Sequence, residues 1–144
     1  MAKVGDVFQV FINTVTIKVA GADNGGALSM FVEEVPAKTG VPMHVHRGAT
    51  ETLFVLRGRF KISIAGKVRE LSEGDGAFLP AGVPHAYSNI DNQRGQLLFT
   101  ISPSGLDGFF EEISQSGLDP ATQLPAINRI AAKYQLEIVG PPLE

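Results

Sequence analysis

Two histidines and a glutamate stand close together in the segment HVHRGATETLFVLRG, residues 44–58. His44 and His46 are spaced i and i+2, so in a strand both imidazoles point to one face. Glu51 would face the other side of a straight strand, and it joins them only if residues 47–50, which include a glycine, supply a bulge or turn. Because imidazole and carboxylate groups are ligands for divalent transition metals, the segment predicts one half of a metal site.

The remaining histidine of the sequence, His85, follows the segment PAGVP. These prolines and this glycine favour a corner that starts a new strand, with His85 at its entrance. Three imidazoles and one carboxylate suit Fe, Mn, Ni, Co, Cu or Zn as divalent ions, and the ligand types alone do not choose among them. We therefore expect one divalent transition metal per chain.

Each of these residues has a more ordinary explanation when it is taken alone. An H-x-H pair mostly lies exposed on the surface or forms local hydrogen bonds. A lone histidine is mostly a hydrogen-bonded core residue or a surface residue, and a lone glutamate indicates no function. The combination favours a metal site because every histidine of the chain takes part in it. Glycines and prolines also fall where the strands would have to turn.

Short strands are the elements that must position these residues. Over the first hundred residues, β-branched and aromatic runs alternate with Gly, Pro, Asn and Asp about every ten residues, which is typical of antiparallel sandwiches and barrels. Helical spacing replaces this pattern near the end, and it predicts a short helix around residues 109–113 and another with Pro125 in its first turn. We expect residues 1–102 to form a β-barrel and residues 103–144 a helical extension packed on it within the same domain.

Composition narrows the functional classes. The 144 residues suffice for one domain with a core, and no cysteine is available for disulfides or thiolate ligands. The net charge is -3 and the basic residues are scattered, so we expect neither nucleic acid nor an anionic membrane as partner. Without a long apolar run or a signal-like N-terminus, the sequence predicts a soluble, cytoplasmic protein that binds a small molecule.

The segments around the histidines resemble the two motifs of the cupin family. The first motif, G-x5-H-x-H-x(3,4)-E-x6-G, is matched at all positions but one by His44, His46, Glu51 and Gly58. At the leading glycine this chain has Lys38, with Gly40 two residues later. The second motif, G-x5-P-x-G-x2-H-x3-N, is matched at every defined position by Gly74, Pro80, Gly82, His85 and Asn89. The motifs lie within residues 40–58 and 74–89.

This resemblance implies an all-β fold, the double-stranded β-helix or cupin jelly-roll barrel, here with a short C-terminal helical extension. It also implies a metal bound by His44, His46, Glu51 and His85, and it makes a homodimer the expected assembly, frequently with strand exchange at the N-terminus. The segments PSGLDGFFEEI and KYQLEIVGPPL look like the C-terminal extension of small bacterial cupins described as quercetin-dioxygenase-like.

Three functions are compatible with such a site. A divalent ion with one carboxylate ligand carries a charge of about +1 and favours an enolate or similar oxyanion. The resemblance to quercetin-dioxygenase-like cupins then implies a dioxygenase acting on an enol or flavonol-like compound. Glu51 could then act as general base. Tyr87 shares the metal-facing side of the strand that begins at His85, and its hydroxyl could reach a bound substrate. The alternatives are a non-redox cupin enzyme (isomerase, epimerase or decarboxylase) and a non-catalytic ligand-binding cupin.

Phe109 and Phe110 could cover the pocket mouth, although anchoring of the helix is the simpler role.

Overall fold

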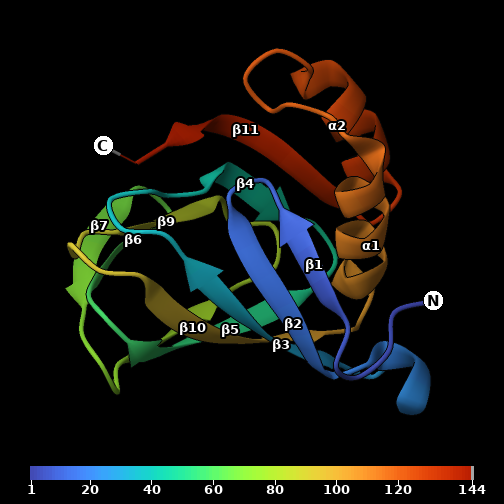
Figure 1. Cartoon of the computed structure of the whole chain (residues 1–144), viewed down its shortest axis with the longest axis horizontal. Coiled ribbons are helices and arrows are strands. Elements are labelled where there is room, and N and C mark those ends of the chain that lie inside the picture. The colour runs from blue at the N-terminus through green and yellow to red at the C-terminus, as the bar shows by residue number, and fades with distance from the viewer. Residues whose placement is uncertain (144) are drawn as a thin grey trace.

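The computed structural model describes residues 1–143, and within this range its strands form a six-stranded and a five-stranded sheet, with antiparallel pairing throughout (Figure 1). In spatial order, the six-stranded sheet consists of β1 (Val7–Val10), β2 (Asn13–Val19), β3 (Ser29–Val35), β10 (Gly95–Ser102), β5 (Thr50–Arg57) and β8 (Gly76–Leu79). The five-stranded sheet consists of β11 (Leu136–Pro142), β4 (Pro42–His46), β9 (His85–Asn89), β6 (Phe60–Ile64) and β7 (Lys67–Leu71). This is the double-stranded β-helix that the sequence predicts.

The core lies between the two sheets because the strands alternate in polarity. In β3 the burial alternates strictly, so that Phe31, Glu33 and Val35 are buried while Val32 and Glu34 are half-exposed. Phe31 stacks on Phe99 of the neighbouring strand β10, with ring centroids 5.3 Å apart. Aromatic pairs at this separation contribute beyond the area that they bury. The sheets therefore pack as two apolar inner faces.

The connection between β3 and β4 shows what replaces the leading glycine of the first motif. Lys38 adopts φ 58°, the left-handed conformation that glycine takes without strain, and its Nζ donates to the carbonyl oxygen of Ile90 at 2.7 Å. Gly40 has a different task, because a Cβ built on it would stand 2.8 Å from the carbonyl oxygen of Tyr87. Gly40 thus allows the chain to pass close to β9.

Two helices cover one side of the barrel, as the sequence predicts (Figure 1). They are α1 (Leu106–Ser116), which packs against β1, and α2 (Leu124–Ala132), which packs against β11. Pro125 lies in the first turn of α2. Buried Asp107 fixes α1 to the barrel through two hydrogen bonds. Its carboxylate accepts one from Oγ of Ser29 at 3.0 Å and one from the amide of Gly21 at 3.1 Å. Gly21 belongs to the 3-10 turn η1 (Gly21–Asp23). Among residues 1–143, no helix is long and apolar enough to cross a bilayer.

The end of the expected helical extension is a strand. Residues 136–142 form β11, which pairs with β4 and places Leu136 opposite His46 and Ile138 opposite His44. Figure 1 shows β11 starting beside the helices and running along the edge of its sheet toward the C-terminus. The sequence does not predict this strand, because the alternation of buried Leu136 and Ile138 with exposed neighbours is short and two prolines follow it. The segment therefore completes the wall beside the histidines.

Candidate metal centre

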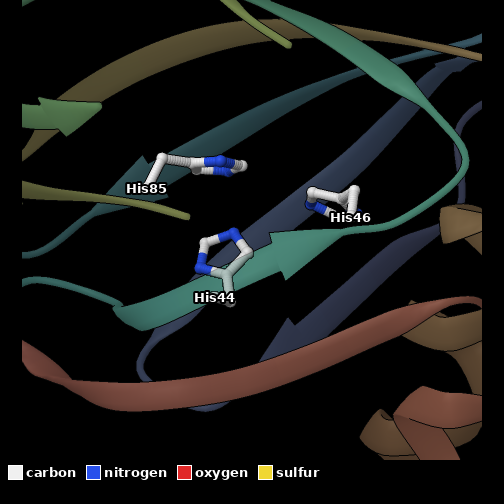
Figure 2. A group of neighbouring side chains, drawn as sticks. All are labelled: His44, His46 and His85. Atoms are coloured by element: carbon white, nitrogen blue, oxygen red, sulfur yellow. The ribbon is translucent and has the colours of Figure 1, made fainter. Parts of the chain in front are cut away.

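The three histidines converge from two neighbouring strands. His44 and His46 lie on β4, and His85, the first residue of β9, pairs directly with His44 in the antiparallel register. Figure 2 shows the three imidazoles gathered beside β4. The ring centroids of His44 and His85 are 4.3 Å apart, and one nitrogen from each ring lies within 4.8 Å of the others. The convergence expected from the sequence is confirmed for these residues.

Glu51 reaches the histidines from the opposite sheet. It is buried on β5, and its Oε1 lies 3.3 Å from Nε2 of His85 and 3.6 Å from Nε2 of His46. The chain leaves the five-stranded sheet after His46 and enters the six-stranded sheet at Thr50. The break that the sequence analysis required is thus a crossover between sheets. Donor atoms that share one ion at about 2.1 Å lie roughly 3 Å apart, which is close to these separations.

Hydrogen bonds to backbone carbonyls orient two of the rings. Nδ1 of His44 lies 2.8 Å from the carbonyl oxygen of Pro42, and Nδ1 of His85 lies 3.3 Å from that of Val83. A carbonyl oxygen only accepts, so both Nδ1 atoms carry the proton and both Nε2 atoms keep a free lone pair. This is the arrangement in which histidine ligands are commonly fixed.

Burial sets the protonation of the group. It lowers the pKa of His44 and His85 to about 4 and that of His46 to about 2, so the imidazoles are neutral at pH 7. Burial likewise raises the pKa of Glu51 to about 7. A neutral imidazole is the form that binds a metal, and a cation bound beside Glu51 would favour its carboxylate.

Two atoms of the group are left without a hydrogen-bond partner. Within residues 1–143, Oε1 of Glu51 and Nε2 of His85 are buried and make no hydrogen bond. A buried polar atom without a partner costs about 1–3 kcal/mol, so a native protein rarely leaves two of them facing one another. Both atoms are electron-pair donors, and a divalent cation between them would satisfy both. The residues present therefore fit a metal ion.

A pocket opens beside the histidines and is mostly apolar. Its cavity volume is about 70 Å³, and its mouth opens to solvent. Besides the polar groups, its walls consist of Val10, Phe11, Val41, Pro42, Phe99, Leu106, Phe109, Phe110, Leu136 and Ile138. Phe109 and Phe110 are also buried, at 3% and 4% exposure, so they anchor α1 and line the pocket at once.

Tyr87 lies in the pocket wall, but its hydroxyl is already engaged. It donates to Oε1 of Glu33 at 2.6 Å, and the buried Asn13 donates to the same oxygen at 3.0 Å. Burial, together with the charge of Glu33, raises the pKa of Tyr87 well above its usual range, so the hydroxyl keeps its proton. Burial also raises the pKa of Glu33 to about 7, against the opposing effect of hydrogen bonds from Tyr87 and Asn13.

Asn13 and Glu33 are pocket residues that the sequence analysis missed. In β3, SMFVEEV, Glu33 occupies the inward series of Ser29, Phe31 and Val35. An acidic residue at an inward position of a strand is a detectable signal, because a carboxylate is seldom buried without a partner. Asn13 at the buried start of β2 carries a weaker form of the same signal.

Comparison with known proteins agrees with this geometry. Residues 31–101 match the family model described as "Cupin domain". This range contains the four residues of the candidate metal site and omits the helices, β11 and Asn13.

Individual proteins with similar sequences or folds cover different parts of the chain. The chain is 31% identical over 86 residues to quercetin 2,3-dioxygenase of Bacillus subtilis (strain 168). The matched segment makes up 60% of this chain and 26% of that protein. The chain is 25% identical over 80 residues to polyketide synthase CurC of Streptomyces cyaneus, over 54% of this chain and 52% of that protein. The structure of KdgF from Halomonas sp. superposes on this chain with a TM-score of 0.62 at 19% identity. The superposed part makes up 69% of this chain and 86% of KdgF. The chain thus spans between a quarter and about half of the curated relatives' lengths.

Proposed function

We propose, from the premise that this chain belongs to the cupin superfamily, that it is a metal-dependent dioxygenase acting on a small enol or flavonol-like compound. In this proposal, His44, His46, His85 and Glu51 hold one divalent transition metal. The observation that carries it is the pair of buried, unpartnered atoms Nε2 of His85 and Oε1 of Glu51, which face each other at 3.3 Å.

The charge of the site supports an enol as substrate. Three neutral imidazoles and one carboxylate around a divalent ion leave a charge of about +1, which favours an enolate oxygen. A redox-active ion, when bound, supplies electron exchange between an enolate and dioxygen. Glu51 is the chain's own carboxylate beside this position, where it can take the proton of the enol hydroxyl.

The pocket wall supports a substrate with an apolar, aromatic body. The rings of Phe99, Phe109 and Phe110 line the pocket together with aliphatic side chains from β11. Such a wall excludes water and leaves orientation to a few polar groups, as is typical of small-molecule sites. Among residues 1–143, no lysine or arginine lines this pocket, which disfavours a phosphorylated substrate.

Similarity to quercetin 2,3-dioxygenase supports the same reaction class. The 31% identity extends over 60% of this chain, but that relative is about four times longer than the matched part. The substrate of this chain is therefore a matter for experiment, and the similarity only selects the first compounds to test.

Oxygen consumption tests the proposal. The protein would be loaded in parallel with Fe(II), Mn(II), Co(II), Ni(II), Cu(II) and Zn(II) and given a panel of enols and flavonols. We expect oxygen uptake coupled to loss of substrate with at least one redox-active ion, and none with Zn(II). His85→Ala should abolish the uptake, while Glu34→Gln, on the outer face of β3, should retain it. No uptake with any redox-active ion would contradict the proposal.

A second candidate is a non-redox enzyme that moves protons on a bound enolate, as in an isomerase or cyclase. Glu33 favours it, since a buried carboxyl with a pKa of about 7 in the pocket can exchange protons at neutral pH. Turnover under anaerobic conditions with Zn(II) would support this candidate. A ligand that co-purifies and never turns over would instead support a binding protein.

We also retain the prediction of a homodimer. Phe54 on β5 and Phe78 on the adjacent strand β8 are 42% and 57% exposed, and they lie on the outer face of the six-stranded sheet. Exposed aromatic side chains on one face are typical of protein contacts. Light scattering on the wild type and on Phe78→Lys checks this prediction, with a shift toward monomer expected for the variant.

A further inference from the structure

A second polar cluster lines the pocket apart from the histidines. It consists of Asn13 on β2, Glu33 on β3 and Tyr87 on β9, so it joins the two sheets across the barrel interior. Oε1 of Glu33 accepts the hydroxyl of Tyr87 at 2.6 Å and Nδ2 of Asn13 at 3.0 Å. Two donors therefore hold one carboxylate oxygen in place.

The remaining acceptors of this cluster are free. Oδ1 of Asn13, a residue only 1% exposed, is buried and has no hydrogen-bond partner within residues 1–143. The amide of Asn13 is fixed, because its Nδ2 must face the oxygen of Glu33. Oε2 of Glu33 also receives no hydrogen bond from the described residues. When Glu33 is deprotonated, the cluster thus offers acceptor oxygens and has no donor of its own left for them.

A purely structural role does not account for this arrangement. An unpartnered buried acceptor costs about 1–3 kcal/mol, and burial of Glu33 adds to that cost. The neighbouring wall is apolar, with Val10, Phe11 and Phe99 around the same pocket. A few fixed polar groups in an apolar pocket are the usual means by which proteins orient a small ligand.

We propose that Asn13 and Glu33 form a recognition position for a hydroxyl group of the substrate, which donates to their free oxygens while another oxygen of the same molecule meets the histidine site. Tyr87 is a positioning residue, because its hydroxyl holds Glu33 and does not itself face the substrate. The substrate is then an enol with an apolar body and at least one further hydroxyl. A carboxylate at that end is excluded by repulsion from Glu33. This inference rests on the proposed function for the enol at the histidine site.

Binding of two matched probes to the Zn(II)-loaded protein tests the inference without turnover. Unsubstituted flavonol offers only the keto-enol group, whereas kaempferol has the same group and further phenolic hydroxyls. A hydrogen bond to a charged acceptor corresponds to a factor of about ten or more in affinity, so calorimetry should give at least about tenfold tighter binding of kaempferol.

Glu33→Gln is the decisive variant. Its amide oxygen can still accept from Tyr87 and Asn13, but the other position becomes an NH2 donor, so most of the preference for kaempferol should be lost. Glu34→Gln, next on the same strand and half-exposed, is the matched control and should keep the preference. Should Glu33→Gln fail to fold, Tyr87→Phe carries the test, since it frees Glu33 from its strongest donor and should reduce the preference. Zinc content and thermal unfolding are measured for each protein.

The outcomes separate this inference from the proposed function. Equal binding of the two probes by the wild type, or an unchanged preference in Glu33→Gln or Tyr87→Phe, would overturn the inference alone. A preference that depends on Glu33, without oxygen uptake under any redox-active ion, would overturn the dioxygenase and leave the recognition position standing. Failure of both probes to bind would overturn both.

Discussion

Nε2 of His85 lies 3.3 Å from Oε1 of Glu51, although β9 and β5, which carry these residues, belong to different sheets. Neither atom has another partner within residues 1–143, and the fold holds them face to face in a buried position. A contact of this kind between two electron-pair donors is stable only with a proton or a cation between them. The proposed metal binding and the pH dependence of the metal affinity both follow from this contact between His85 and Glu51.

Metal affinity should depend on one proton between about pH 5 and pH 7. The imidazoles have pKa values of about 4, 2 and 4 and are already neutral there, whereas Glu51, with a pKa of about 7, must lose its proton when the ion binds. The association constant for Zn(II) should therefore rise about tenfold per pH unit up to about pH 7 and then level off. Competition with a chelator across this range measures the slope.

A different slope would contradict this account of the protonation. Histidines with their ordinary pKa near ~6.5 would release up to three protons, so the affinity would fall far more steeply below that pH. Glu51→Gln offers the control, because its amide has no proton to lose and its weaker binding should be nearly independent of pH in this window.

Much of the fold and of the candidate site was predictable from local sequence. The i, i+2 spacing of His44 and His46 placed both rings together on β4, and the corner before His85 placed it at the start of β9, where it pairs with His44. The resemblance of two segments to the cupin motifs implied the double-stranded β-helix, which the structure shows. The resemblance is confirmed by the match over residues 31–101.

The parts that could not be predicted depend on contacts between distant segments. β11 is stabilised by pairing with β4, which precedes it by about ninety residues, and its own sequence has little strand character. Glu33 and Asn13 meet Tyr87 only after both sheets have formed. Tyr87 was expected to reach the substrate with its hydroxyl; that role stays untested, and the hydroxyl is paired with Glu33 in this structure.

Glu33→Gln should stabilise the metal-free protein at high pH. The pKa of Glu33 is raised from 4.5 to about 7 on folding, so the wild type has its full stability below about pH 4.5 and loses some as the pH rises through 7. The variant has no carboxyl at this position and does not lose this stability. Its unfolding free energy relative to that of the wild type should therefore increase by about 3 kcal/mol from pH 4 to pH 8. Urea denaturation of both proteins at the two pH values measures this change.

The control for that comparison is Glu34→Gln, whose side chain is half-exposed on the other face of β3. Its stability relative to the wild type should not change with pH by a comparable amount. A difference for Glu33→Gln that stays constant from pH 4 to pH 8 would show that the carboxyl of Glu33 titrates normally.

Gly40→Ala should weaken the barrel next to the candidate site. The added methyl group would stand 2.8 Å from the carbonyl oxygen of Tyr87 and 3.0 Å from Cβ of Ser88, so β9 has to move. Overpacking of this kind costs about 1–3 kcal/mol, which urea denaturation resolves. Gly140→Ala, on the edge strand β11, meets only the side chain of Met43 at 3.3 Å and should cost less. Equal costs for the two variants would contradict the assigned role of Gly40.

The central claim is that His44, His46, His85 and Glu51 bind one metal ion, and elemental analysis of protein purified without added metal tests it most directly. We expect about one redox-active transition-metal ion per chain in the wild type and in Glu34→Gln. His46→Ala and His85→Ala should lose most of this metal while circular dichroism shows a folded β-protein. Full metal occupancy in either folded histidine variant would contradict the assignment of the ligands.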